Sequence, residues 1–211
     1  MSGLFITFEG IDGCGKTTQL KLAQEYLRSK ELPLIVTREP GGTPIAEKIR
    51  EIIISPHHSE MTDACELLLY LAARAQHVGE RIVPALKDGK VVLCDRFQEA
   101  TFAYQGYGRG YDLSVLREMN RFATDDIHPA QTFIFDLPVE DAFERMKKMN
   151  KAPDRLEQNS AAFYQKIRSG YLELARNESH RVCVLDATQP VEQIAALVED
   201  RIDELLREKK L

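Results

Sequence analysis

The chain has 211 residues, of which 44% are apolar and 29% are charged, and its formal net charge is −5. This length suits one domain with a full hydrophobic core. The mild acidity argues against a dedicated nucleic-acid binder, because such proteins normally carry a basic patch.

No segment of the sequence has the features of a targeting or membrane segment. Residues 1–10 lack the basic start and apolar core of a signal peptide, and no apolar run approaches the length of a bilayer span. The four cysteines are scattered and form no C-x-x-C pair, which is typical of thiols in a reducing cytosol. We therefore expect a single domain over residues 1–211 in the cytoplasm, with neither nucleic acid nor a membrane as partner.

Short apolar runs alternate along the chain with stretches of helical period. The expected strands are apolar or β-branched and are bounded by glycine, proline or charge: Leu4–Glu9, Leu34–Thr37, Val91–Cys94, Thr132–Leu137 and Val182–Leu185. Such continuous runs are typical of strands covered on both faces of a parallel sheet. The helical patterns between and after them include Thr17–Lys30, the long Ala64–Leu86 and a final helix through residues 194–205. This alternation predicts a doubly wound α/β sandwich of about five strands.

The loop after the first expected strand fits the pattern G-x-x-x-x-G-K-[ST] in full. It reads Gly10-Ile11-Asp12-Gly13-Cys14-Gly15-Lys16-Thr17 and stands between a strand and a helix, as a P-loop requires. Glycines let backbone N–H groups approach phosphates, and the helix N-terminus adds positive potential. Lys16 can reach the β- and γ-phosphates of a nucleoside triphosphate, and the Thr17 hydroxyl can bind Mg²⁺. The alternative is a glycine-rich turn that happens to precede a helix.

A P-loop alone leaves the class of protein open, because GTPases, motor ATPases and small-molecule kinases all use it. A GTPase would normally carry an N-K-x-D element, and the sequence has none. The third expected strand leads into Asp95 and Arg96, at the sheet edge where open α/β sheets bind ligands. Asp95 could hold Mg²⁺ or its water shell and Arg96 a second phosphate group; the alternative is a surface ion pair.

Two further features indicate a second anionic substrate beside the P-loop. Arg38 follows the second expected strand within TREPGGT, residues 37–43. Arg74 follows Tyr70 by four residues in the long helical pattern, which places both side chains on one side of the helix. A base could stack on Tyr70 while Arg74 reaches its edge, although Tyr70 could equally be a core aromatic.

Over nearly its whole length the chain is similar to the bacterial thymidylate kinases, which transfer the γ-phosphate of ATP to dTMP to form dTDP for dTTP synthesis. The resemblance lies in the segments FEGIDGCGKTTQ (8–19), TREPGGT (37–43), LLLYLAAR (67–74), CDRF (94–97), TFAYQGYGRG (101–110), DRLEQ (154–158) and DATQP (186–190). It implies the P-loop nucleoside monophosphate kinase fold, with a five-stranded parallel sheet flanked by helices on both faces and a short lid at about residues 145–157. It also implies dependence on Mg²⁺ and a homodimer formed through apolar helices such as Ala64–Leu86.

The resemblance further implies roles for individual residues. ATP would be bound by Gly10, Ile11, Asp12, Gly13, Cys14, Gly15, Lys16, Thr17, Thr18, Arg145, Thr188 and Gln189, and Mg²⁺ by Thr17 and Asp95. dTMP would be bound by Asp12, Arg38, Pro40, Tyr70, Arg74, Arg96, Thr101, Tyr104 and Gln105. Among these, Arg38 and Arg96 would hold the phosphate, Arg74 the carbonyl edge of thymine, and the Tyr104 ring would disfavour a 2′-hydroxyl. Tyr70 stands where phenylalanine is more usual, so a ring for stacking is kept.

The charge that completes the catalytic site is expected in the lid. Some members of the family have an arginine in the P-loop immediately after the acidic residue, but here that position is Gly13. The resemblance therefore implies that the basic stretch 145–155 supplies the cation, with Arg155 at the γ-phosphate and Arg145 near adenine or a phosphate. The residues expected in catalysis are Asp12, Lys16, Arg96 and Arg155.

Two other functions remain open at this point. One is a deoxynucleoside monophosphate kinase with a different choice of base. The other is a nucleotide-gated switch that binds ATP and signals by lid movement, which the arginines of the second site argue against because a switch needs no acceptor.

Overall fold

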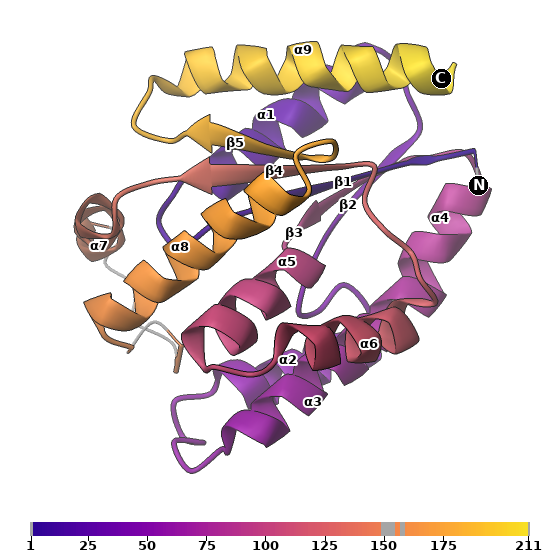
Figure 1. Cartoon of the computed structure of the whole chain (residues 1–211). Coiled ribbons are helices and arrows are strands. Elements are labelled where there is room, and N and C mark those ends of the chain that lie inside the picture. The colour runs from indigo at the N-terminus through magenta and orange to yellow at the C-terminus, as the bar shows by residue number, and fades with distance from the viewer. Residues whose placement is uncertain (1, 149–154, 157–158, 211) are drawn as a thin grey trace.

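A computed structural model describes residues 2–148, 155–156 and 159–210, and their arrangement is that of a single parallel sheet between helices (Figure 1). The strands are β1 (Leu4–Glu9), β2 (Leu34–Arg38), β3 (Val91–Asp95), β4 (Gln131–Asp136) and β5 (Val182–Asp186), in the order β2-β3-β1-β4-β5. All four strand pairings are parallel, and each expected strand is confirmed to within one residue at either end. The five-stranded doubly wound sheet predicted from the sequence is therefore correct.

Helices cover both faces of the sheet. On one face lie α1 (Lys16–Ser29) and α9 (Val191–Lys209), which pack against each other (Figure 1). The opposite side holds α8 (Ala161–Asn177) and a layer formed by the remaining long helices, α2 (Pro44–Ile54), α3 (Asp63–His77) and α6 (Leu113–Thr124). The shorter α7 (Val139–Lys148) lies beyond the carboxyl ends of the strands, and α5 (Gln98–Thr101) continues into the π-helical segment η2 (Phe102–Gly108).

The long helix expected over Ala64–Leu86 is interrupted in its hydrogen-bond pattern. The structure has α3 to His77, a π-helical segment η1 over Val78–Ile82, and α4 over Val83–Lys87. Pro84 stands at the beginning of α4 and has no N–H to donate to the preceding turn. The π-helical segment directly precedes this proline, so the helix type changes where a regular hydrogen-bond pattern would otherwise need the missing N–H.

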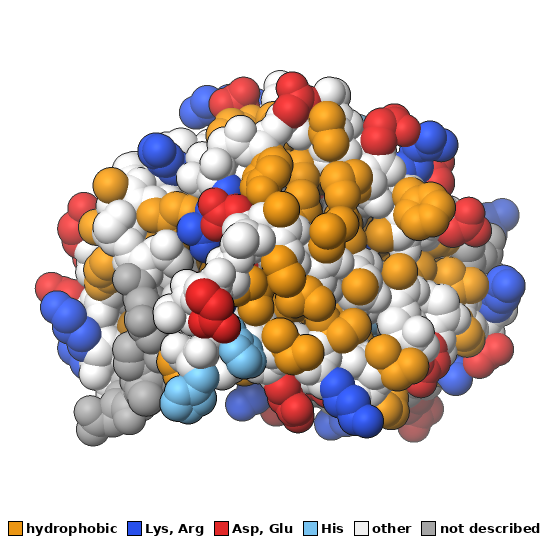
Figure 2. Space-filling view, turned by 90° about the horizontal axis from the view of Figure 1, so that it is seen from below, with side chains coloured by type: hydrophobic (Ala, Val, Ile, Leu, Met, Phe, Trp, Pro, Cys, Tyr) orange, Lys and Arg blue, Asp and Glu red, His pale blue; other side chains and the backbone are white. Residues whose placement is uncertain are grey.

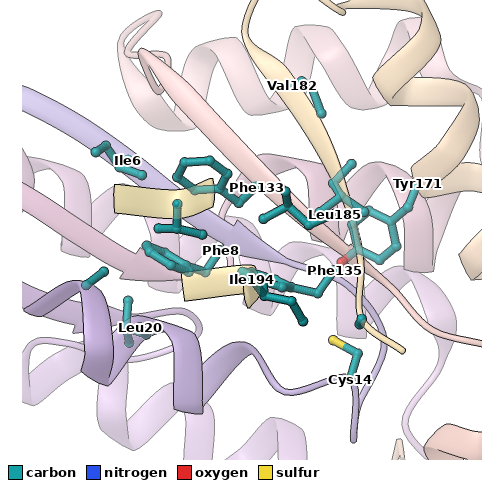
Figure 3. Close-up of a cluster of buried hydrophobic side chains, with 14 of the residues drawn as sticks. Ile6, Phe8, Cys14, Leu20, Phe133, Phe135, Tyr171, Val182, Leu185 and Ile194 are labelled. Atoms are coloured by element: carbon teal, nitrogen blue, oxygen red, sulfur yellow. The ribbon is translucent and has the colours of Figure 1, made fainter. Parts of the chain in front are cut away.

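The main core fills the space between the sheet and the helices α1, α8 and α9. Phe8 of β1 packs between Phe133 and Phe135 of β4, with ring centroids 5.7 and 5.9 Å apart. Figure 3 shows Leu20 of α1 and Ile194 of α9 against these rings, and Cys14 of the P-loop beside them. The P-loop is therefore anchored directly on the core. In the part of the chain that the structure describes, no helix is long and apolar enough to cross a membrane.

Burial of α1 predicts a clear difference between two leucines. Leu27 is 0% exposed on α1, whereas Leu197 on α9 is 51% exposed. Leu27→Ala should lower the free energy of unfolding by about 2–5 kcal/mol, because it leaves a cavity in the core. Leu197→Ala should change it by less than about 0.5 kcal/mol. Urea unfolding of both variants checks this; equal losses would show that α1 is not packed as described.

Candidate active site

The P-loop curves around the ammonium group of its own lysine. Lys16 is buried and donates from Nζ to the carbonyl oxygens of Gly10, at 3.0 Å, and Ile11, at 2.8 Å. Gly15, the residue that caps the N-terminus of α1, has a φ of 98°, a conformation that favours glycine. The loop thus brings a positive charge and the N-terminus of α1 to one point, which is the arrangement that binds phosphates.

Gly13 is enclosed by the helix that leads into the expected lid. Its φ is 79°, and a Cβ atom added there would lie 2.6 Å from the carbonyl oxygen of Ala142 in α7. Real Cβ atoms do not approach backbone oxygen so closely. Position 13 therefore requires glycine in this arrangement, because α7 occupies the space that a side chain would need.

Thr17 and Asp95, the expected metal-binding pair, are brought together by the sheet. Asp95 ends β3 beside Phe8 of β1, and the Thr17 hydroxyl donates to its Oδ2 at 3.4 Å. Hydroxyl and carboxylate oxygens are ligands suited to Mg²⁺, which is commonly held by one or two carboxylates together with substrate phosphates and water. Among the described residues there is no cluster of three or more His, Cys, Asp or Glu side chains that would hold a metal without a nucleotide.

A solvent-open pocket with about 590 Å³ of empty space lies next to the P-loop. Of the residues expected to bind the second substrate, all but Arg38 line it: Asp12, Pro40, Tyr70, Arg74, Arg96, Thr101, Tyr104 and Gln105. The shared side of Tyr70 and Arg74, expected from their spacing, thus faces the pocket. Arg38 instead points outward, with 55% of its side chain exposed, and donates to Glu47 at 2.9 Å.

An ion pair joins the P-loop to this pocket. Arg96 donates from Nη2 to Asp12 Oδ1 at 2.6 Å and from Nη1 to the Gly10 carbonyl at 2.9 Å. The Tyr104 hydroxyl donates to the other carboxylate oxygen of Asp12 at 3.0 Å. Burial alone would raise the pKa of Asp12, but the charges of Arg96 and Lys16 hold this pKa well below its usual range. Asp12 is therefore an anion that can only accept hydrogen bonds.

A buried glutamate that the sequence analysis did not select, Glu9, supports Arg96 from behind. Arg96 has a φ of 69°, which is unusual for a residue with a side chain. Glu9 accepts from the backbone N–H of Phe97 at 2.6 Å and from the Tyr171 hydroxyl at 2.8 Å, and so fixes the turn directly after Arg96. Burial and the charge of Glu99 raise the pKa of Glu9 to about 8. Its sequence signal is a charge at the end of an apolar strand, one residue before the P-loop.

Arg74 is buried and forms a hydrogen-bond network with other residues of the protein. It donates to Glu39 at 2.6 Å, to Thr101 at 2.8 Å and to Asn120 at 2.9 Å, and from Nη2 to the Phe97 carbonyl at 2.8 Å. One N–H of Nη2 is left after these bonds with described residues. The guanidinium is thus held rigidly at the pocket wall by acceptors that the sequence analysis missed, Glu39 and Asn120, which lie far from it in the chain.

Residues expected to bind ATP gather at the other end of the P-loop. Arg145 donates to the Ala187 carbonyl at 3.0 Å, and its Nη1 lies 4.0 Å from the Cβ position at Gly15. Thr188 and Gln189 follow Ala187, and both donate to Asp186. Thr18, in the first turn of α1, is exposed beside the loop.

Arg155 is placed differently from its expected role at the γ-phosphate. It donates from Nη2 to Glu66 Oε2 at 2.6 Å and from Nε to the Ile53 carbonyl at 2.8 Å. The structure therefore brings Arg155 to the ends of α2 and α3 and not to the P-loop. Of the expected lid, residues 149–154 and 157 lie outside the described residues, as do Asp154, Glu157 and Gln158 of DRLEQ.

A P-loop beside an arginine-lined second pocket, both at the carboxyl edge of a parallel sheet, defines a P-loop kinase of small phosphorylated acceptors. The family model described as thymidylate kinase matches residues 8–198, and the chain belongs to the thymidylate kinase family.

Individual members of the family are similar over most of their length. The thymidylate kinase of Geobacter sp. strain M21 is 50% identical over 205 residues, which cover 95% of this chain and 91% of that protein. The thymidylate kinase of Pelotomaculum thermopropionicum is 49% identical over 189 residues, 90% of this chain and 88% of that protein. The crystal structure of thymidylate kinase from Ehrlichia chaffeensis is 34% identical, with a TM-score of 0.77 over 95% of this chain and 98% of its own.

The raised pKa of Glu9 predicts a pH dependence of stability. Glu9 binds a proton more tightly in the folded chain, with a pKa of about 8, than at its ordinary value of 4.5. Its contribution to stability is therefore complete below pH 4.5 and is lost as the pH rises through 8. Glu9→Gln mimics the protonated acid. Between pH 4.5 and 8 the free energy of unfolding of this variant should therefore fall less steeply with pH than that of the unmodified protein, and the two slopes should differ by at most about 1.4 kcal/mol per pH unit.

Urea unfolding at several pH values measures this difference in slope. The matched control is Glu25→Gln, which removes an exposed carboxylate of α1 and should leave the slope of the unmodified protein unchanged. A Glu9→Gln slope equal to that of the control would contradict the assignment of a protonated Glu9.

Proposed function

We infer that the chain transfers the γ-phosphate of ATP to dTMP and so forms dTDP. The observation that carries this inference is that the P-loop and the second pocket meet at the same two residues, Asp12 and Arg96. Arg96 lines that pocket while it bonds the P-loop carbonyl of Gly10, and Asp12 belongs to both. A donor phosphate bound by the P-loop and an acceptor phosphate bound beside Arg96 would therefore lie next to each other. Membership of the thymidylate kinase family identifies the acceptor.

On the acceptor side, we propose that Arg96 binds the dTMP phosphate and that Tyr70 stacks on the base. Arg74 would donate its remaining N–H to the base edge, with Pro40, Thr101 and Gln105 as neighbours in the pocket. The Tyr104 ring, held by its bond to Asp12, would lie against the sugar and exclude a 2′-hydroxyl. Arg38, engaged with Glu47 at the surface, would bind the phosphate only after it exchanges that partner.

On the donor side, the backbone N–H groups of the P-loop and of Thr18 would bind the triphosphate together with Lys16. Arg145, Thr188 and Gln189 would surround adenine. The hydroxyl of Thr17 and the carboxylate of Asp95 would hold Mg²⁺, which supplies neutralisation of the phosphate oxygens. We propose that residues 1–211 form one catalytic domain with a lid at about residues 145–157.

Catalysis would consist of alignment and charge neutralisation. Phosphoryl transfer passes through a loose transition state, and the dTMP phosphate is already a nucleophile, so no general base is assigned. Lys16 and Arg96 would balance the charge on the transferring group, with Asp12 holding Arg96 in place. Arg155 stays the predicted γ-phosphate contact, and this role requires its guanidinium to exchange Glu66 for the phosphate.

A panel of acceptors tests the function. ADP release in the presence of ATP should be much faster with dTMP than with dUMP, dCMP, dGMP or AMP. Lys16→Ala should reduce transfer to dTMP by at least about a hundredfold, because it removes a charge that the transition state needs. Equal rates with all acceptors would refute the choice of dTMP, and tight ATP binding without ADP formation from any acceptor would favour a nucleotide-gated switch.

We propose that the chain forms a homodimer through the outer surface of α3 and α6. Leu68 of α3 is 56% exposed and Phe122 of α6 is 92% exposed, and both border a groove lined by Leu71, Ala72, Ala75, Met119 and Ala123. Figure 2 shows hydrophobic side chains gathered over this side of the molecule. An exposed apolar surface of this kind on a folded domain marks an interface. A second copy of the chain would cover it by apposing the same two helices.

The dimer proposal predicts the effect of one surface charge. Light scattering should give twice the chain mass of 24.0 kDa for the unmodified protein. Leu68→Glu should shift it towards the monomer, since the interface would bury an unpaired carboxylate. Leu197→Glu, at a comparably exposed leucine of α9, should remain dimeric. A monomeric unmodified protein would refute the proposal.

A further inference from the structure

We propose that Glu66 is a positioning residue that orients the amide of Gln105, so that the acceptor pocket accepts a base with an N–H at ring position 3 and rejects one without it. The proposal rests on the proposed function and adds to it the residue that decides whether Gln105 accepts or donates a hydrogen bond at the base edge. Glu66 stands one residue before the segment LLLYLAAR (67–74) and does not line the pocket. It contacts the side of the Gln105 amide that faces away from the pocket.

Glu66 is a buried anion at the meeting point of three segments. Its side chain, on α3, is 1% exposed. Oε1 accepts from Gln105 Nε2 at 2.9 Å, and Oε2 accepts from Arg155 at 2.6 Å and from Arg109 at 3.1 Å. Burial alone would raise the pKa of Glu66, but the hydrogen bonds from Gln105 and Arg155 and the charge of Arg109 lower this pKa.

An ionised carboxylate can only accept hydrogen bonds, and this fixes the orientation of Gln105. The NH₂ end of the Gln105 amide must face Glu66, since its carbonyl end would place two acceptors against each other. The opposite end, Oε1, then remains for the pocket that Gln105 lines, and it has no hydrogen-bond partner among the described residues. Glu66 thus presents a hydrogen-bond acceptor to the base.

The edge of thymine matches this polarity. It offers a donor at N3–H beside an acceptor at the O4 carbonyl, and these suit Gln105 Oε1 and the remaining N–H of Arg74. Cytosine has the reverse pattern, an unprotonated N3 and an amino group at position 4. A cytosine base would therefore set acceptor against acceptor and donor against donor at the buried side chains of Gln105 and Arg74, and such mismatches give strong discrimination.

A pair of nucleotides that differ only at this edge tests the proposal. 5-Methyl-dCMP keeps the methyl group, sugar and phosphate of dTMP, and the readout is the ratio of the two kcat/KM values. This ratio is independent of the fraction of folded enzyme, because both substrates are measured on one preparation. We expect the unmodified protein to prefer dTMP by at least about a hundredfold.

Glu66→Gln should lower this preference at least tenfold, because a glutamine can donate as well as accept and lets the Gln105 amide turn over. The matched control is Arg109→Gln, which breaks an ion pair of Glu66 but alters no residue that lines the pocket. Its preference should stay within twofold of that of the unmodified protein. In a Gln105→Met background, Glu66→Gln should have no further effect on the ratio.

An unchanged ratio in Glu66→Gln, or an equal loss in Arg109→Gln, would overturn the positioning role while dTMP phosphorylation stands. If Glu66→Gln does not fold, Gln105→Met alone decides, and an unchanged preference in that variant overturns the proposal. Absence of ADP formation from dTMP by the unmodified protein would instead refute the proposed function, and the inference with it.

Discussion

The ion pair between Arg96 and Asp12 is the interaction on which the rest of the site depends. Strands β1 and β3 are neighbours and run in the same direction, so the residues that follow them meet at one edge of the sheet. Arg96 takes a left-handed backbone conformation there and turns back to bond both Asp12 and the Gly10 carbonyl. The P-loop and the neighbouring pocket are thereby held at a fixed separation, and phosphoryl transfer depends on such fixed positions because its catalysis is largely a matter of alignment.

Three buried glutamates keep this arrangement rigid. Glu9 fixes the turn after Arg96, Glu39 holds Arg74, and Glu66 holds Gln105 together with two arginines. Removing one partner of a buried charge pair typically costs about 3–5 kcal/mol, since the other charge is left unpaired. The anions Glu39 and Glu66 therefore confine the Arg74 guanidinium and the Gln105 amide at the pocket wall, while the protonated Glu9 fixes the backbone that follows Arg96. This preorganisation limits the reorganisation that ligands must induce.

The sequence was sufficient to predict the strands, the P-loop and Arg96, because these depend on local patterns and on the rule that ligands bind at the carboxyl ends of parallel strands. The pocket residues Thr101, Tyr104 and Gln105 were expected only from the resemblance to a known family. Tyr70 and Arg74 could be paired by helical spacing alone. The supporting glutamates were missed, although Glu9 carries a signal as a charge at the end of an apolar strand. Glu39 and Glu66 could not be assigned, since their partners are set by tertiary packing and Glu39 meets Arg74 across 35 residues of chain. The orientations of Arg38 and Arg155 were equally out of reach, because each depends on a carboxylate supplied by tertiary packing.

The contact between Gly13 and α7 ties the backbone of the P-loop to the position of that helix. In this chain the carbonyl of Ala142 fills the space that any side chain at position 13 would need. A side chain at position 13 would therefore require α7 to move, so the residue that the P-loop carries there and the packing of α7 are coupled.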